Sequence, residues 1–368
     1  MLDATIDPTT IRRVLVVKLR HHGDVLLSSP VFRVLKNHLP QIDIDALVYR
    51  DTVEMLSEHP DVSLVHTIDR EWKRMGVIKQ ASAELQLIRA LKARRYDMLL
   101  HLTEHPRGAW LTRLLRPRIS VAPRANGMSE GRDSNWWRAS FTHTFPLPAT
   151  TFRHTVEQNL DAVRRLGIYP TVAEKKLVLV PGQAANEKVN TLMATHGIIA
   201  KRFIHMHPTS RWFFKTWPAE KCAELILRLG KQGEQVVLTA APTADERAMI
   251  AAIKTHLKAP VVDLTGELNL KELAALTARA KAFVGVDSAP MHIAAAMQTP
   301  VVALFGPSGE KHWGPWATKF RVVASIKPEH SCRPCGNDGC GGSKVSDCLV
   351  TLSVEDVHEA VNAILLEP

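Results

Sequence analysis

Four short clusters of polar residues could carry chemistry, and each follows an apolar run of strand length. The clearest lies in KAFVGVDSAPMHIAAAMQTPVVALFGPS, residues 281–308. Asp287 and Ser288 follow its first apolar run. Ala289 begins a helix of small residues, and His292 lies about one turn into that helix. Because the amino end of a helix offers unpaired N–H groups and a positive dipole, this cluster predicts a site for an anion such as a diphosphate.

Two further clusters in the second half of the chain have the same strand-then-loop pattern. In HPTSRWFFKTWP (207–218), Thr209 and Ser210 offer hydroxyl groups and Lys215 offers a positive charge, the groups that a diphosphate requires. In APTADER (241–247), Asp245 or its neighbour Glu246 could bind ribose hydroxyls. A polar loop and a charged helix start explain these two clusters equally well when each is taken alone.

The fourth cluster, Lys18…His21-His22-Gly23-Asp24, lies near the N-terminus. Gly23 permits a turn, and Asp24 is predicted at the N-cap of an amphipathic helix over 25–39. A carboxylate at the end of a strand could also serve as a general base. A simple helix cap is the alternative for an isolated aspartate.

These clusters need strands that end along one edge of a sheet. Strand-like runs alternate with amphipathic helical stretches in both halves of the chain, and this pattern predicts an α/β fold with two Rossmann-like, doubly wound parallel sheets that face each other across a cleft. We expect an N-terminal domain over 1–172, a linker near 169–182, a C-terminal domain over 173–352 and a helix in 353–368 that packs back towards the N-terminal domain. The predicted strands are at 12–18, 42–49, 62–68, 96–102, 119–122, 203–207, 235–240, 260–263, 282–286 and 301–305.

Composition limits the class of protein. The chain has 368 residues, with 47 Lys and Arg against 37 Asp and Glu, which gives a net charge of +10. This balance suits an acidic substrate or an anionic membrane face better than nucleic acid, because the basic residues are scattered and no recognition motif accompanies them. We find no uninterrupted apolar stretch of about 18 residues and no signal-peptide pattern, so we expect a cytosolic protein that can still reach the membrane surface.

Four of the five cysteines are crowded into one segment, as Cys332, Cys335, Cys340 and Cys348. Their spacing, C-x2-C-x4-C-x7-C, differs from the paired C-x2-C units of a zinc ribbon. A structural zinc site and a Gly-rich loop packed by reduced thiols both remain open. In either case the cysteines are not expected to act in catalysis, and we expect no metal at the reaction site.

Three of the segments above resemble the lipopolysaccharide heptosyltransferase family, glycosyltransferase family 9: VLVVKLRHHGDVLLSSPVF, HPTSRWFFKTWP and FVGVDSAPMHIAAAMQTPVVALFGP. The resemblance runs in order over nearly the whole chain. The RHHGD form, DTVEMLSEHPDV, HTIDREWK and the Cys-rich segment are most similar to the heptosyltransferase III type. This resemblance implies a GT-B fold, an ADP-L-glycero-D-manno-heptose donor, and an inverting, metal-independent transfer to the second heptose of the inner core through an α1→7 bond.

The resemblance also implies roles for single residues. Asp24 matches the family's catalytic base, and Lys215 would stabilise the charge on the leaving ADP. The other donor contacts implied are Thr209, Ser210, Asp245, Asp287, Ser288, Ala289 and His292. Three features depart from the family pattern: the segment RWFF at 211–214, before Lys215, is a residue longer and more aromatic than in a relative, Ala289 stands where that relative has Gly, and Ala244 stands beside Asp245 at the ribose position.

The implied acceptor is a phosphorylated lipid A carrying Kdo and heptose, at the cytoplasmic face of the inner membrane. Arg20, His21, Arg107 and Arg124 are candidates for contacting it, as is Arg132, although a solvated surface explains each one alone. The stretch 124–141 is predicted to be an irregular loop, and we expect its Trp136 and Trp137 to rest at the membrane interface.

Several alternatives stay open. They are a family member with a type I or type II acceptor, another GT-B enzyme with a different sugar, and a nucleotide-sugar-binding protein without catalysis. A dehydrogenase is disfavoured, because no G-x-G-x-x-G follows a predicted strand.

Overall fold

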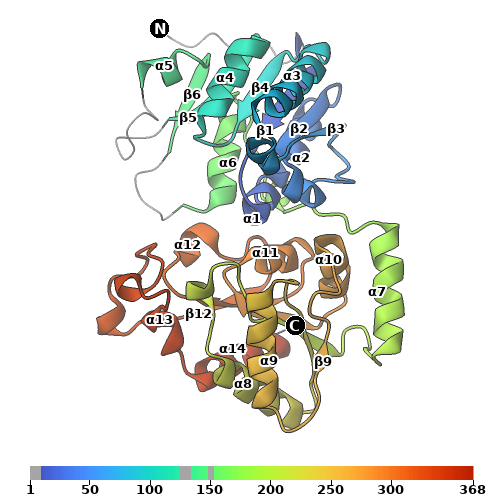
Figure 1. Cartoon of the computed structure of the whole chain (residues 1–368), viewed down its shortest axis with the longest axis vertical. Coiled ribbons are helices and arrows are strands. Elements are labelled where there is room, and N and C mark those ends of the chain that lie inside the picture. Colours follow the sequence, from blue (N-terminus) through green and yellow to red (C-terminus); the bar gives the residue numbers. More distant parts are fainter. Residues whose placement is uncertain (1–9, 125–133, 148–152, 368) are drawn as a thin grey trace. The chain divides into compact units, whose positions relative to one another are not determined.

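The computed structural model describes residues 10–124, 134–147 and 153–367. The chain forms two compact units, residues 1–178 and 179–368, and the division falls inside the linker expected at 169–182. Each unit contains a six-stranded sheet in which all neighbouring strands run parallel, with helices on its faces (Figure 1). The prediction of two doubly wound α/β units is therefore confirmed.

The sheet of the N-terminal unit has the order β3-β2-β1-β4-β5-β6. Its central strand β1, RVLVV, reads as an almost continuous apolar run, as expected for a parallel sheet covered by helices on both faces. β6 was not anticipated from the sequence: its residues, HTFP, form a short strand at the edge of the sheet, where only one neighbour pairs with it. The strands are β1 (Arg13–Val17), β2 (Asp43–Tyr49), β3 (Leu64–Ile68), β4 (Met98–His101), β5 (Ile119–Arg124) and β6 (His143–Pro146).

The helix expected over 25–39 is in fact two helices, α1 (His22–Leu26) and α2 (Ser29–His38). The predicted N-cap position of Asp24 is also wrong. His21 is the N-cap, with an extended backbone, and its carbonyl accepts a hydrogen bond from the Val25 N–H at 3.0 Å. The other helices of this unit are α3 (Val77–Ala93), α4 (Pro106–Leu115), α5 (Asn135–Arg138), α6 (Thr155–Arg164) and the 3-10 helices η2 (Arg50–Met55), η3 (Arg70–Arg74) and η4 (Ala173–Lys175).

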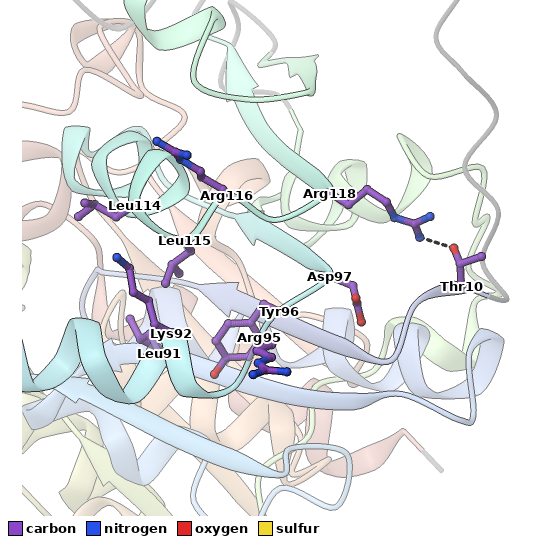
Figure 2. A pocket seen from close by; sticks show the side chains of 10 residues that line it. All are labelled: Thr10, Leu91, Lys92, Arg95, Tyr96, Asp97, Leu114, Leu115, Arg116 and Arg118. Atoms are coloured by element: carbon purple, nitrogen blue, oxygen red, sulfur yellow. Dashed lines mark hydrogen bonds between the residues drawn. The ribbon is translucent and has the colours of Figure 1, made fainter.

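A cavity of about 710 Å³ opens at the end of this sheet where β4 and β5 begin (Figure 2). Asp97 and Arg118, which precede these two strands, belong to its lining. The carboxyl ends of the strands, where ligands of open α/β sheets bind, lie at the opposite edge. The remaining lining residues are Thr10, Leu91, Lys92, Arg95, Tyr96, Leu114, Leu115 and Arg116.

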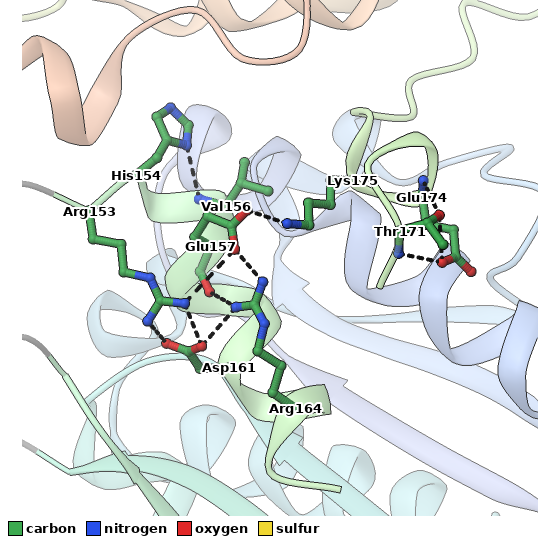
Figure 3. A network of polar contacts seen from close by, with 9 residues as sticks. All are labelled: Arg153, His154, Val156, Glu157, Asp161, Arg164, Thr171, Glu174 and Lys175. Atoms are coloured by element: carbon green, nitrogen blue, oxygen red, sulfur yellow. Dashed lines mark hydrogen bonds and ion pairs between the residues drawn. The ribbon is translucent and has the colours of Figure 1, made fainter. Parts of the chain in front are cut away.

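A network of ion pairs holds α6 to the last segment of the N-terminal unit (Figure 3). Glu157 on α6 pairs with Arg164 and, at 2.9 Å, with Lys175 of η4. Asp161 pairs with Arg164 at 2.8 Å and with Arg153 at 2.5 Å. Burial opposes ionisation of Glu157, but hydrogen bonds from Lys175 and Arg164 outweigh it and lower the pKa of this carboxyl. The network therefore fixes α6 in place.

The sheet of the C-terminal unit has the order β12-β11-β10-β7-β8-β9. Its edge strand β12 was also not predicted from the sequence. The first two residues of β12, Phe320 and Arg321, are exposed, so the strand lacks a continuous buried apolar run. The strands are β7 (Phe203–His207), β8 (Gln235–Leu238), β9 (Val262–Asp263), β10 (Ala282–Val286), β11 (Val301–Phe305) and β12 (Phe320–Ala324). The helices are α7 (Gln183–Thr195), α8 (Ala219–Lys231), α9 (Ala244–Thr255), α10 (Leu270–Ala278), α11 (Ala289–Ala296), α12 (Glu310–Trp313), α13 (Asp347–Val350) and α14 (Val354–Leu366), with the 3-10 helices η5 (Phe213–Lys215), η6 (Pro328–His330) and η7 (Cys340–Gly342).

The C-terminal helix α14 packs on the sheet of the C-terminal unit. α14 lies against α8 and against β10, β11 and β12, and Val357, Val361 and Ile364 are buried in the core of the C-terminal unit. The apolar stripe of α14 thus packs on the sheet of its own unit, and the expected packing back towards the N-terminal domain stays a prediction.

The stretch predicted as an irregular loop is only partly described. Residues 125–133, including Arg132, lie outside the described residues, while Trp136 and Trp137 lie on α5. Trp137 is 1% exposed and donates its indole N–H to the Pro123 carbonyl at 3.0 Å. The prediction that Trp137 rests at a membrane interface is therefore wrong, whereas Trp136 is 36% exposed.

The described residues include no helix of the length and apolarity needed to span a bilayer.

Candidate functional site

The loops that carry the predicted donor residues follow three neighbouring strands of the C-terminal unit. β10, β7 and β8 are adjacent in the sheet, so their carboxyl ends meet along one edge. Hydrogen bonds tie the loops together there: Lys215, after β7, contacts Asp287, after β10, and Thr209, after β7, contacts Glu246, after β8. The structure therefore brings residues from all three predicted clusters of this unit into one constellation.

The ion pair of this constellation joins Lys215 Nζ to Asp287 Oδ2 at 2.6 Å. The Asp287 side chain is 7% exposed and that of Lys215 is 21% exposed. A lysine ammonium has three N–H donors, and this pair uses one of them. Asp287 can thus orient Lys215 while the ammonium still offers donors and charge to an anion.

A buried chain of hydrogen bonds lies beneath the loop after β7. The Thr239 hydroxyl contacts His205 Nε2 at 2.7 Å and His207 Nδ1 at 2.8 Å. His207 Nε2 in turn contacts the Thr209 hydroxyl at 3.2 Å. This hydroxyl donates to Glu246 Oε2 at 2.6 Å. Burial lowers the pKa of both histidines to about 3, so the rings are neutral at pH 7. The Thr209 hydroxyl could donate to a ligand only by releasing Glu246.

Glu246 makes buried hydrogen bonds that hold the loops together, a role that was not predicted from the sequence. It is 5% exposed, accepts from the Ala241 N–H at 2.9 Å as well as from Thr209, and its own N–H bonds the Thr243 side chain. The T-x-x-E pattern at a helix start signals this capping position. Its neighbour Asp245 is exposed in the first turn of α9, so of the two carboxylates Asp245 is the accessible one.

The start of α11 has the expected geometry. Ser288 is its N-cap, but the Ser288 side chain makes no capping hydrogen bond; its hydroxyl donates to the Val286 carbonyl at 3.3 Å. Ala289 is the first helical residue, and His292 is buried one turn later. Ser210 is also buried, and its hydroxyl oxygen accepts from the Trp212 N–H at 3.2 Å. The backbone N–H groups of the first turn thus have no Ser288 cap competing with an anion.

In the N-terminal unit, Asp24 lies on α1 and is partly exposed. Lys18 is buried below it: its ammonium donates to the Leu102 carbonyl at 3.0 Å and to Asn159 Oδ1 at 2.9 Å. The Asn159 amide then donates to the carbonyl of Leu27, the C-cap of α1, at 2.9 Å. Burial lowers the pKa of Lys18 to about 8, although the charge of Asp24 opposes this shift. Lys18 and Asn159 therefore hold the helix that carries Asp24.

The four predicted acceptor residues lie at the carboxyl edge of the same sheet. Arg20 and His21 follow β1, Arg107 lies in the first turn of α4 after β4, and Arg124 ends β5. The Arg107 guanidinium is already paired with Glu84 at 2.7 Å. The main-chain carbonyl of Arg20 accepts from Arg70 at 3.2 Å, which ties the β1 loop to η3.

A cavity of about 140 Å³ at this edge contains residues that were not predicted for the site. Tyr49 and Trp72 provide aromatic surface, and the Arg70 guanidinium carbon lies 3.7 Å from the centre of the Tyr49 ring. Aromatic surface beside several hydrogen-bonding groups suits a polar ring such as a sugar. The signal in the sequence was the HTIDREWK segment, which begins inside β3 and continues into η3, and to which no site residue was assigned. The other lining residues are Ile68, Asp69, Lys73, Gln80, Glu84, His105 and Arg107.

The cysteine segment does not form a metal centre in the described part of the chain. Cys332, Cys335 and Cys340 are exposed free thiols, and Cys348 is a buried one. Burial raises the pKa of the Cys348 thiol to about 11. Among residues 10–124, 134–147 and 153–367, no three His, Cys, Asp or Glu side chains are grouped so that they could hold a metal ion.

Comparison with known proteins gives consistent results. The model of glycosyltransferase family 9 (heptosyltransferase) matches residues 84–340. Lipopolysaccharide heptosyltransferase 3 of Escherichia coli is 35% identical over 303 residues, which cover 82% of this chain and 86% of that protein. The crystal structure of a family 9 glycosyl transferase from Veillonella parvula has a TM-score of 0.80 at 22% identity and covers 97% of this chain and 98% of its own. The E. coli heptosyltransferase WaaC with ADP-2-deoxy-2-fluoro heptose has a TM-score of 0.68 at 20% identity, with 95% and 99% covered. These likenesses confirm the predicted GT-B fold class.

Proposed function

Because the chain belongs to glycosyltransferase family 9, the heptosyltransferases, we propose that it transfers L-glycero-D-manno-heptose from ADP-heptose to the second heptose of the lipopolysaccharide inner core. The bond formed in this proposal is α1→7, with inversion at the anomeric carbon. The name of the E. coli relative, heptosyltransferase 3, supports the acceptor, and the nucleotide sugar in the WaaC structure supports the donor.

The observation that carries the donor assignment is the constellation at the carboxyl ends of β7, β8 and β10. There the Lys215–Asp287 ion pair adjoins the start of α11, whose first N–H groups are not capped by the Ser288 side chain. A lysine charge beside a helix amino end is suited to a diphosphate. We assign the diphosphate to Lys215, Ser210, Ser288 and Ala289, with Thr209 supporting the loop, and the heptose and ribose to Asp287, His292 and Asp245.

In the proposed reaction, Asp24 accepts the proton of the acceptor hydroxyl as the bond between the anomeric carbon and the ADP oxygen breaks. Lys215 and the amino end of α11 stabilise the negative charge that builds on the ADP. Fixed donors of this kind stabilise a transition state more than a ground state, because the charge develops only as the bond breaks. The positive charge of Lys215 lets the transfer proceed without a metal ion in this scheme.

The acceptor we propose is a phosphorylated lipid A that carries Kdo and heptose, reached at the cytoplasmic face of the inner membrane. Arg20, His21, Arg107 and Arg124 would contact its anionic groups. The cavity beside Tyr49 and Trp72 supports this assignment, because its polar and aromatic lining fits a sugar ring.

Mass spectrometry of defined acceptors tests the proposal. Purified protein is incubated with ADP-heptose and a truncated inner core that ends at the second heptose, and we expect a product with one additional heptose. Matched acceptors that lack one or both heptoses distinguish a type II or type I activity, and a UDP-sugar in place of ADP-heptose controls for the donor. Addition only to the shorter acceptors would contradict the assigned acceptor, and no addition to any of them would contradict the transferase itself.

A further inference from the structure

The amino-terminal edge of the sheet in the N-terminal unit has a basic surface that the proposed reaction does not use. The cavity of about 710 Å³ at this edge is lined by Lys92, Arg95, Arg116 and Arg118. Figure 2 shows these four side chains around the cavity, with Leu114 and Leu115 near Lys92. Because the strands are parallel, this edge is opposite to the edge that carries Asp24 and Arg107.

The positive charge of this surface is not neutralised by the residues around it. In the described part of the chain, none of these four cations forms an ion pair, and Arg118 donates to the Thr10 hydroxyl instead. The one carboxylate in the lining, Asp97, already accepts hydrogen bonds from the N–H groups of Arg12 and Arg13, at 2.8 and 2.9 Å. Four exposed cations against this one carboxylate leave the surface with an excess of positive charge that is available to a partner.

Large apolar side chains continue the same surface along α4. Trp110 and Leu114 are four residues apart and thus share one face of the helix, and they are 58% and 42% exposed. The Trp110 ring packs against Trp136 of α5, with ring centres 5.2 Å apart. Since Leu114 also lines the basic cavity, the aromatic pair and the cations form one continuous surface.

We propose that this surface, formed by Trp110, Leu114 and Trp136 with Lys92, Arg95, Arg116 and Arg118, docks the protein on an anionic phospholipid bilayer. Tryptophan rings favour the level of the lipid headgroups, where one part of the ring is apolar and the N–H is hydrated. Clustered Lys and Arg side chains are attracted to anionic headgroups and strengthen binding by about fivefold each. Both features occur here side by side.

The geometry of the tryptophans favours a bilayer over single-stranded nucleic acid. Bases stack on open aromatic faces. Here the two rings are tilted by 55° against each other, and the Arg113 guanidinium carbon lies 5.5 Å from the centre of the Trp136 ring. The tilted rings offer no pair of parallel faces between which a base could stack, while the exposed Trp110 and Leu114 can insert between headgroups.

The inference rests on the proposed function only in that a lipid-borne acceptor requires the enzyme to reach a membrane. It is tested without substrate, by sedimentation of the full chain with vesicles of phosphatidylglycerol and phosphatidylcholine. We expect binding to anionic vesicles that weakens as salt is raised. The triple variant Lys92→Gln, Arg95→Gln, Arg116→Gln should bind at least tenfold more weakly, and Trp110→Ala with Trp136→Ala should also lose binding.

Matched variants separate this surface from the general positive charge of the protein. Arg202→Gln, Lys231→Gln and Lys258→Gln remove three exposed cations from the C-terminal unit, and Tyr169→Ala removes an exposed aromatic residue of the N-terminal unit. These controls should bind vesicles as the wild type does. All variants should keep kcat and KM with a water-soluble truncated acceptor, because the altered residues lie away from the proposed site.

Equal loss of vesicle binding in the control variants would overturn the inference, and so would equal binding of the wild type to neutral and anionic vesicles. A third contrary outcome is a triple variant that loses binding to a single-stranded oligonucleotide but keeps its binding to vesicles. A protein that docks normally but transfers no heptose would contradict the proposed function alone.

Discussion

The carboxyl edges of the two sheets use buried polar residues in different ways. In the C-terminal unit, Lys215 pairs with Asp287, and a chain of side chains from His205 to Glu246 satisfies its members mutually. In the N-terminal unit, the buried Lys18 donates to a main-chain carbonyl and an amide oxygen, and Asp24 is partly exposed. One edge is therefore fixed by contacts between side chains of separate loops, whereas at the other edge Lys18 and Asn159 support the short helix that carries Asp24.

This difference fits the different roles proposed for the two edges, which are stabilisation of the diphosphate and proton abstraction by a general base. A diphosphate is best stabilised by donors that are already in place, because reorganisation during the reaction would cost free energy. A general base must instead stay accessible to an acceptor and exchange protons with it. The comparison predicts that changes at the two edges will affect different steps of the reaction.

The largest effect is expected for Asp24→Asn. Loss of a general base costs a factor of about 10²–10⁴ in rate, so kcat should fall by that amount. The dissociation constant of ADP-heptose, measured by calorimetry, should stay within about threefold of the wild type, since the donor residues are untouched. Asp245→Asn is the matched control, because it removes an exposed carboxylate in the same way. Its kcat should be far higher than that of Asp24→Asn. A kcat for Asp24→Asn near that of the wild type would remove Asp24 from the role of base.

A smaller effect with a different signature is expected for Lys215→Gln. Removing one donor that stabilises developing negative charge costs about 10²–10³ in kcat, and here the affinity for ADP should fall as well. Lys221→Gln is the matched control, because its amine caps the carbonyls of Val350 and Leu352 in the same unit. Unchanged ADP binding in Lys215→Gln would show that the diphosphate lies elsewhere.

The smallest effect concerns the pH dependence of stability at Lys18. Burial lowers its pKa from 10.5 to about 8, so between these pH values the unfolded chain binds more protons than the folded one, and the free energy of unfolding rises with pH. Relative to Lys18→Met, the wild type should gain up to about 3 kcal/mol between pH 8 and 10.5.

Urea unfolding of both proteins across this pH range measures the difference, and using the difference cancels titrations that the two proteins share. Lys36→Met is a parallel control, because its amine also donates to a main-chain carbonyl, that of Ile42, but at a partly exposed position. A constant difference between the wild type and Lys18→Met would show that Lys18 is not buried in solution as the structure has it.

Local sequence was sufficient for the strands that are buried on both faces. Runs such as VLVV of β1 and VVALF of β11 are continuous and apolar because helices cover both sides of the sheet, and their positions were predicted closely. The edge strands β6 and β12 were missed, because β6 has only four residues and β12 begins with the exposed Phe320 and Arg321. The break between α1 and α2 was missed as well, because both helices share one amphipathic pattern.

The amino-acid sequence by itself determined the fold class, the family and the clusters at strand ends, because these depend on residue types at short spacings. Tertiary structure alone decided which clusters touch. Glu246 rather than Asp245 holds the Thr209 loop, Trp137 turns into the core while Trp136 meets solvent, and α14 packs on its own unit's sheet. Each of these outcomes depends on which apolar face or buried hydrogen-bond partner lies opposite in space, and spacing along the chain does not contain that information.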